Sequence, residues 1–253
     1  MFRQRISDNK YLKAEPLLII GMIRIFTVCI FICSFFISKA SNIPGADMSY
    51  VYLGSGNYKI IITAYRDCNG IQLSSGNATI TSGKTTFSLN LKTESVEDIS
   101  KINKSCIKSK CAGGSYAYGF EKHVFYGIVN LGAYTNLCEF NVSWQQCCRS
   151  GAISTGAAGE NFYVDMLINR CYDSTNSAPQ FTMPPLSTVA VNEPVTYNPI
   201  MIDSMDGYDS LSYEMVLPYR AAGSGISYSG SYSLDAPLKY FGFAQNKEIA
   251  KAK

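Results

Sequence analysis

From residue 45 onward, apolar and polar residues alternate along the chain with a period of two. In the segment 138–148 one set of alternate positions is apolar and the other is polar, namely Cys138, Phe140, Val142 and Trp144 against Glu139, Asn141, Ser143 and Gln145. Because neighbouring side chains of a strand point to opposite faces of its sheet, this alternation predicts strands with one buried face.

Segments with the length of strands and many β-branched or aromatic residues recur along the chain. The predicted strands cover residues 48–53, 58–66, 77–81, 85–91, 122–131, 138–148 and 161–170. Residues 93–104 are the one suggestion of a helix, with Ser95 as N-cap and Asp98 three residues later, and a loop is an equal alternative. The pattern favours an all-β fold, an antiparallel β-sandwich stapled by disulfides.

A polar stretch that ends in proline, residues 173–179, predicts a boundary between two units. Beyond it, residues 189–191, 193–197 and 211–216 have the composition of further strands. We expect a cysteine-rich β-sandwich over residues 41–175, a partial immunoglobulin-like or cadherin-like β-sandwich over residues 176–240 and a disordered tail over residues 241–253.

The N-terminal segment predicts export. Residues 17–37 are strongly apolar and are followed by Ser38-Lys39-Ala40, a pattern of small residues typical of signal-peptide cleavage sites. We predict that residues 1–40 are a signal peptide whose translation starts at Met22, or an uncleaved membrane anchor as the alternative. The protein is then secreted or attached to the cell surface, in association with the outer membrane.

The charge balance excludes nucleic acid as a partner. The whole chain carries a formal net charge of +3, but residues 1–40 hold six basic and two acidic residues. The rest of the chain is therefore about one unit negative, without the clustered basic surface that phosphate backbones require.

Seven cysteines follow the leader, in which Cys29 and Cys33 lie. They are Cys68, Cys106, Cys111, Cys138, Cys147, Cys148 and Cys171. In an oxidising compartment these residues are first of all disulfide candidates, and an odd number predicts one free or intermolecular thiol.

The adjacent pair Cys147 and Cys148 raises the question of partners. If the alternation of the preceding strand continues, Cys148 points inward and Cys147 outward, so we expect each to bond elsewhere. Cys106 and Cys111 enclose a loop short enough to be closed by their own disulfide. A zinc site built from these four cysteines is the alternative, although their spacing is not that of zinc ribbons.

Few residues suggest catalysis. His123 is the only histidine, and its charged neighbours predict a surface position. No nucleophile elbow, phosphate-binding loop or His-Glu-x-x-His motif occurs. We therefore expect a protein that is not an enzyme. The competing hypothesis is a secreted carbohydrate-active enzyme or carbohydrate-binding module, for which Asp165 or Glu160 would serve as general acid or base.

Three carboxylates near the C-terminal end form a candidate calcium site. Asp203, Asp206 and Asp209 are closely spaced around a glycine, and Ca²⁺ prefers six to eight oxygen ligands. The EF-hand pattern fails because no glutamate occupies its closing position. An acidic turn without an ion is an equal alternative, so Ca²⁺ is the only cofactor that the sequence suggests.

Six ordered motifs resemble a known class of proteins. They are Tyr65-Arg-Asp-Cys-Asn-Gly70, Gly119-Phe-Glu-Lys-His-Val-Phe-Tyr126, Gln146-Cys-Cys-Arg149, Asn161-Phe-Tyr-Val-Asp-Met-Leu-Ile-Asn-Arg170, Asn176-Ser-Ala-Pro179 and Asp206-Gly-Tyr-Asp-Ser-Leu-Ser-Tyr213. Together they resemble the N-terminal module of large secreted Bacteroidetes surface proteins that carry PKD or immunoglobulin-like repeats and a gliding-motility-associated sorting domain.

The resemblance implies a surface-exposed adhesion or structural protein. It also implies a calcium-binding turn in the cadherin-like part, which Tyr208 interrupts here, and a cysteine near residues 189–194 whose absence would leave Cys171 unpaired. No sorting domain follows, so we expect a truncated version. The leading hypothesis is a non-catalytic adhesion module whose tyrosine-rich loops contact a surface protein or a glycan.

Overall fold

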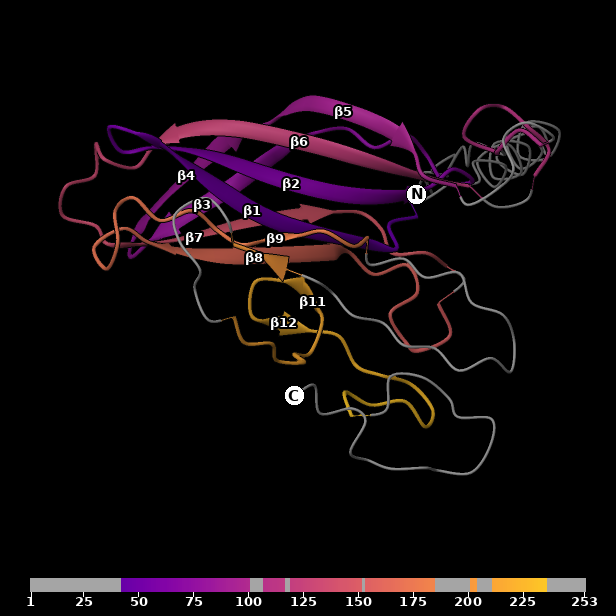
Figure 1. Ribbon diagram of the computed structural model, residues 1–253. Coiled ribbons are helices and arrows are strands. Elements are labelled where there is room, and N and C mark those ends of the chain that lie inside the picture. The colour runs from indigo at the N-terminus through magenta and orange to yellow at the C-terminus, as the bar shows by residue number, and fades with distance from the viewer. Residues whose placement is uncertain are drawn as a thin grey trace, which may run out of the picture. The chain divides into compact units, whose positions relative to one another are not determined.

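The chain divides into two compact units, residues 1–39 and residues 40–253. A computed structural model describes residues 42–100, 107–116, 119–151, 153–184, 201–203 and 211–235, all of them in the second unit (Figure 1). These residues form strands, turns and loops, and no helix occurs among them. The all-β prediction is therefore confirmed.

One layer of the fold is a four-stranded antiparallel sheet. Its order is β1 (Gly45–Gly54), β2 (Asn57–Asp67), β6 (Phe120–Asn130) and β5 (Lys92–Asp98). The central pair, β2 and β6, runs in unbroken register from Asn57 opposite Asn130 to Asp67 opposite Phe120.

The other layer is a six-stranded antiparallel sheet. Its order is β12 (Ser224–Gly225), β11 (Tyr219–Ala221), β8 (Phe162–Asn169), β7 (Glu139–Gln146), β3 (Asn77–Ser82) and β4 (Thr85–Asn90). A separate two-stranded pair consists of β9 (Gln180–Phe181) and β10 (Met201–Ile202).

The core lies between the two main sheets, which form the two layers seen in Figure 1. Ile60 and Ile62 of β2 and Phe125 of β6 are fully buried, as are the residues of β7 that alternation assigned to the inner face. The rings of Phe125 and Trp144 lie 6.4 Å apart across the layers. Removing this apolar surface from water is the main force that holds the sheets together.

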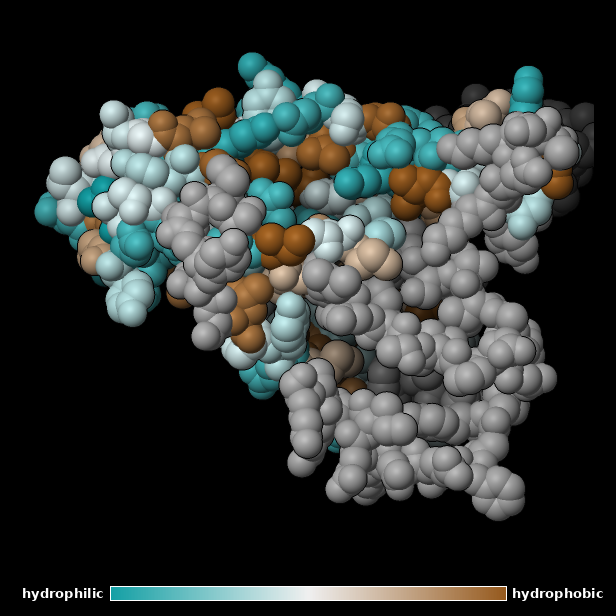
Figure 2. Space-filling model, in the orientation of Figure 1, coloured by the Kyte–Doolittle hydropathy of each residue, from teal (hydrophilic) through white to brown (hydrophobic). Residues whose placement is uncertain are grey.

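The outer surface follows the same alternation. Val96 on β5 and Ile128 on β6 are about half exposed, and polar side chains surround them. Over the four-stranded sheet, Figure 2 shows hydrophobic residues interspersed with hydrophilic ones. Scattered exposed apolar residues of this kind are usual on soluble domains.

The crossing from β4 to β5 between the two sheets takes a single residue, Leu91. It separates β4, at the edge of the longer sheet, from β5, at the edge of the shorter one. Its side chain is buried in the core, and its backbone N–H donates to the carbonyl of Gly76. The two sheets are thus joined covalently along one side without an intervening loop.

The predicted strands up to residue 170 are all present, and two other predictions were wrong. Residues 92–98 form strand β5 instead of a helix, with Ser95 paired to Val124 of β6. Residues 211–216 are extended but belong to no strand. Pairing with β6 outweighs the weak helical preference of residues 92–98. Residues 211–216 have the composition of a strand but no partner strand among the described residues. The segments 101–104, 189–191 and 193–197 lie outside the described residues.

Residues from both sides of the predicted boundary near residue 175 contribute to one sheet. Tyr219 of β11 pairs with Tyr163 of β8, and the N–H of Ala178 donates to the carbonyl of Tyr50 at 2.8 Å. Part of the segment 176–240 therefore extends the first sandwich.

We predict that Phe140→Ala destabilises the protein by about 3 to 5 kcal/mol, because it removes a fully buried aromatic side chain and leaves a cavity. The matched control is Leu167→Ala on the next strand, whose side chain is 57% exposed and should cost less than about 1 kcal/mol. Urea unfolding measures both values. Equal losses would contradict the assignment of inner and outer faces.

Candidate functional site

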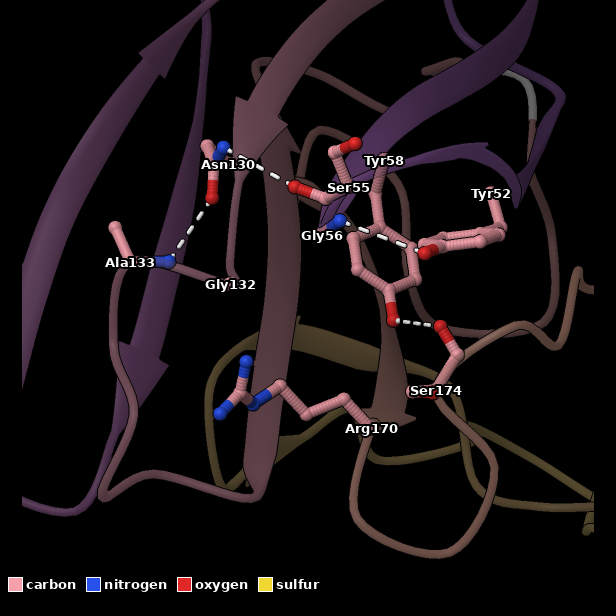
Figure 3. Close-up of a pocket in the computed structure, with 9 residues that line it drawn as sticks. All are labelled: Tyr52, Ser55, Gly56, Tyr58, Asn130, Gly132, Ala133, Arg170 and Ser174. Carbon is pink, nitrogen blue, oxygen red and sulfur yellow. Dashed lines mark hydrogen bonds between the residues drawn. The ribbon is translucent and has the colours of Figure 1, made fainter.

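An open pocket with a volume of about 570 Å³ lies at one end of the sandwich. Nine residues line it, as Figure 3 shows: Tyr52, Ser55, Gly56, Tyr58, Asn130, Gly132, Ala133, Arg170 and Ser174. They come from the hairpin between β1 and β2, from the end of β6 with the loop that follows, and from the chain just after β8. The pocket thus forms where three distant segments meet.

Main-chain contacts form one wall of the pocket. The N–H groups of Leu131 and Gly132 both donate to the carbonyl of Gly56, at 2.9 and 3.1 Å. Gly56 has φ of +74°, and a Cβ atom there would lie 2.6 Å from the Cα of Gly132. Only glycine suits both the left-handed conformation and this close approach.

Two tyrosines lie beside this wall. Tyr58 is 1% exposed, and its hydroxyl donates to the carbonyl of Ser174 at 2.9 Å. Burial raises the pKa of Tyr58, which keeps this hydroxyl protonated as a donor. The ring of Tyr52 lies 5.3 Å from that of Tyr58 and is partly exposed. Its hydroxyl accepts a long hydrogen bond from the N–H of Gly56 (Figure 3).

Arg170 provides the only charged side chain of the lining. Its guanidinium donates to three backbone carbonyls of the loop after β6, those of Leu137 at 2.9 Å, Leu131 at 3.2 Å and Thr135 at 3.3 Å. Among the described residues, no carboxylate lies within ion-pairing distance of Arg170. The arginine therefore orders the loop and leaves the pocket with a positive charge.

The lining lacks the groups that hydrolytic catalysis needs. None of the nine lining residues is an aspartate, glutamate, histidine or cysteine. Glu160 forms an ion pair with Arg220 at 3.3 Å, and Asp165 accepts a hydrogen bond from Asn141 at 3.0 Å. The structure therefore does not bring the two candidate carboxylates of the enzyme hypothesis into this pocket. Its chemistry suits recognition of a ligand.

Two long-range disulfides hold the ends of the sandwich. They join Cys68 to Cys111 and Cys138 to Cys171, each with 5.1 Å between Cα atoms. The expected bond between Cys106 and Cys111 is therefore wrong, and Cys171 is not unpaired. Cys106 itself lies outside the described residues. Because Cys171 follows Arg170 directly, the second disulfide fixes one wall of the pocket to the start of β7.

The adjacent cysteines, Cys147 and Cys148, bond to each other, so the prediction of separate partners was wrong. Their exposure follows the prediction, because Cys148 is 8% exposed and Cys147 lies on the surface. The argument from opposite faces failed because β7 ends at Gln146, before both cysteines. These bonds also exclude the predicted zinc site, since three of its four proposed ligands are disulfide-bonded.

His123 is buried, contrary to the predicted surface position. It is 1% exposed, and its Nε2 lies 3.1 Å from the carboxylate of Glu121. Arg66 pairs with the same carboxylate at 2.6 Å and donates to two backbone carbonyls of the loop that follows. All three side chains project from the inner face of the β2–β6 pair, where the carboxylate of Glu121 is shared by Arg66 and His123.

This charged cluster adjoins the first disulfide. The sulfurs of Cys68 and Cys111 lie within 4.8 Å of a carboxylate oxygen of Glu121. Sulfurs that are bonded to each other are not thiolate ligands, so the group acts as a structural cluster at the end of the sandwich opposite the pocket.

The candidate calcium site is only partly within the described residues. Asp203 follows β10 and is 8% exposed. Asp206 and Asp209 lie outside the described residues. The calcium site therefore stays a prediction.

Sequence reasoning did not identify the pocket. It placed Arg170 in a motif and predicted strands on both sides of residues 54–57, but it did not bring the two regions together. A local signal that could have indicated the pocket is the pair Gly54 and Gly56, which lies between two predicted strands that contain several tyrosines.

Comparisons with known proteins add no further assignment. No protein-family model matches the chain, and no curated protein or solved structure matches it either. Within the part of the chain that the structure describes, no helix is long and apolar enough to cross a membrane. The resemblance to Bacteroidetes surface proteins therefore stays a prediction.

We predict that peptide mapping of the unreduced protein identifies cross-linked peptides that contain Cys68 with Cys111 and Cys138 with Cys171. Replacing Cys138 and Cys171 together by alanine should lower the free energy of unfolding by about 2 to 4 kcal/mol, since the bond restricts the unfolded chain. A peptide that links Cys106 to Cys111 would contradict this connectivity.

We also predict that His123 makes stability depend on pH. Burial lowers its pKa below the usual 6.5, so the unfolded state binds the proton more readily than the folded state. The contribution of His123 to the free energy of unfolding should be highest above about pH 6.5 and should fall as the pH drops below this value.

The measurement is the difference between wild type and His123→Gln in urea unfolding at a series of pH values. A difference is needed because Asp47, whose pKa burial raises to about 6, contributes a slope of opposite sign. The glutamine variant should lose less stability on acidification than the wild type. Parallel curves would show that His123 does not titrate differently in the two states.

Proposed function

We propose that this protein is an exported, non-catalytic binding module that serves adhesion or a structural role at the cell surface. Its disulfides fit an oxidising, extracytoplasmic environment. Long-range disulfides also suit a module that must keep its fold outside the cell, because they restrict the unfolded chain.

The observation that carries the proposal is the composition of the pocket. Its walls combine tyrosine rings, hydroxyl and amide groups and one guanidinium, all positioned by hydrogen bonds. It contains no pair of carboxylates and no activated nucleophile. Such a pocket can hold a ligand in one orientation but offers no group to transfer a proton to it at neutral pH.

The partner that we propose is a surface protein or a glycan. An open pocket at the end of a sandwich is accessible to a group that projects from a larger molecule. Tyrosine contributes a large contact area and a hydroxyl while losing little conformational entropy, which suits this use.

The test uses the full chain, exported by a Gram-negative host and purified, on an array of surface glycans and surface-protein peptides. We predict that Ala133→Gln lowers retention of the bound ligand by about tenfold or more, because the larger side chain enters the pocket from an exposed position. The matched control is Ala112→Gln, an exposed alanine in a loop outside the lining, which should bind as the wild type does.

Two outcomes would overturn the proposal. One is equal binding by the wild type and both variants, which would place recognition elsewhere. The other is the appearance of cleavage products from a bound glycan, which would favour the carbohydrate-active enzyme instead.

A further inference from the structure

The charge of Arg170 points to the chemistry of the ligand. A guanidinium has five N–H groups, and three of those in Arg170 are used on the loop carbonyls. Two remain for a ligand. Backbone carbonyls satisfy the geometry of the guanidinium but do not neutralise its charge, so an anion in the pocket gains a charge-assisted hydrogen bond.

The nearest acidic side chain in the following turn does not replace that anion. Asp173 accepts hydrogen bonds from the N–H and the hydroxyl of Thr175, at 2.8 and 2.9 Å. These bonds hold the pKa of Asp173 below its usual value. The carboxylate is thus directed to its own turn, and Asp173 is not among the lining residues.

The rest of the lining matches a ligand that is both hydroxylated and ring-shaped. Tyr52 presents a partly exposed ring, and its hydroxyl hydrogen stays available because the oxygen only accepts from Gly56. The side chain of Asn130 and the chain around Ser55 and Ser174 add exposed polar groups at the mouth. In Figure 3, these groups surround the same open space as the arginine.

We propose that the pocket binds an acidic sugar residue, whose carboxylate pairs with Arg170 while its hydroxylated ring lies against Tyr52. The inference rests on the proposed function, since it names the ligand class of the same pocket. A carboxylate alone would use the arginine but neither the tyrosine ring nor the polar mouth, and a neutral sugar would leave the guanidinium without an anion.

The first experiment compares two probes by isothermal titration of the full chain, a galacturonate oligosaccharide and a galactose oligosaccharide of the same length. We expect the acidic probe to bind about tenfold tighter. Added salt should reduce this difference, because it screens the charge interaction. Acetate should compete weakly, since it lacks the ring. Equal binding of the two oligosaccharides, or equal competition by acetate, would overturn the inference.

Variants that remove a charge test whether the preference for the acidic probe arises in the pocket. Arg170→Gln should abolish the preference for the acidic probe, whereas Asp173→Asn should strengthen acidic binding about twofold because it removes a nearby negative charge and retains the oxygen that accepts from Thr175. The matched control is Arg220→Gln, an exposed arginine outside the lining that should leave both affinities unchanged.

Arg170→Gln also removes three loop hydrogen bonds, so the result must not depend on that variant alone. Asp173→Asn leaves the loop intact, and Ala133→Gln should weaken both probes equally. If an array ligand without a carboxylate binds in the pocket and only Ala133→Gln removes it, the acidic-sugar inference fails and the binding function stands. If Ala133→Gln affects the binding of no ligand, the acidic-sugar inference and the proposed binding function of the pocket both fail.

Discussion

The continuous pairing of β2 with β6 is the feature on which the rest of the structure depends. Over eleven residues of each strand the register never shifts. Its inner face supplies Ile60, Ile62 and Phe125 to the core. One of its ends carries the pocket beside Tyr58, and the other carries the charged cluster around Glu121. One pair of strands thus sets the distance between the pocket and the charged cluster.

The disulfides reinforce this arrangement at each end. The bond between Cys68 and Cys111 lies beside the charged cluster, and the bond between Cys138 and Cys171 lies beside Arg170. The first joins the end of β2 to the segment 107–116, and the second joins the start of β7 to the end of β8. Each bond restricts the unfolded chain by closing a long loop.

The strands and the buried core could be predicted from the sequence, but the pocket could not. The alternation of apolar and polar residues predicted the strands and their buried faces, because a half-buried strand has apolar residues at every second position. It failed for β5, whose exposed residues pair with β6 without an apolar pattern, and for Cys147 and Cys148, which follow the end of a strand. The position of His123 was missed because its hydrogen bond with Glu121 depends on a cluster that includes Arg66.

The pocket was beyond sequence reasoning for a related reason, since its residues come from three segments that meet only in the folded chain. The contact of Gly56 with Gly132 nevertheless has a consequence for how such a pocket can diversify. The side chains of Tyr52 and Asn130 hold this wall, since they accept from the N–H groups of Gly56 and Ala133. The side chain of Ala133 takes no part in these bonds, so an exchange at this one position alters the lining while the frame stays the same, and the lining can then evolve separately from the architecture.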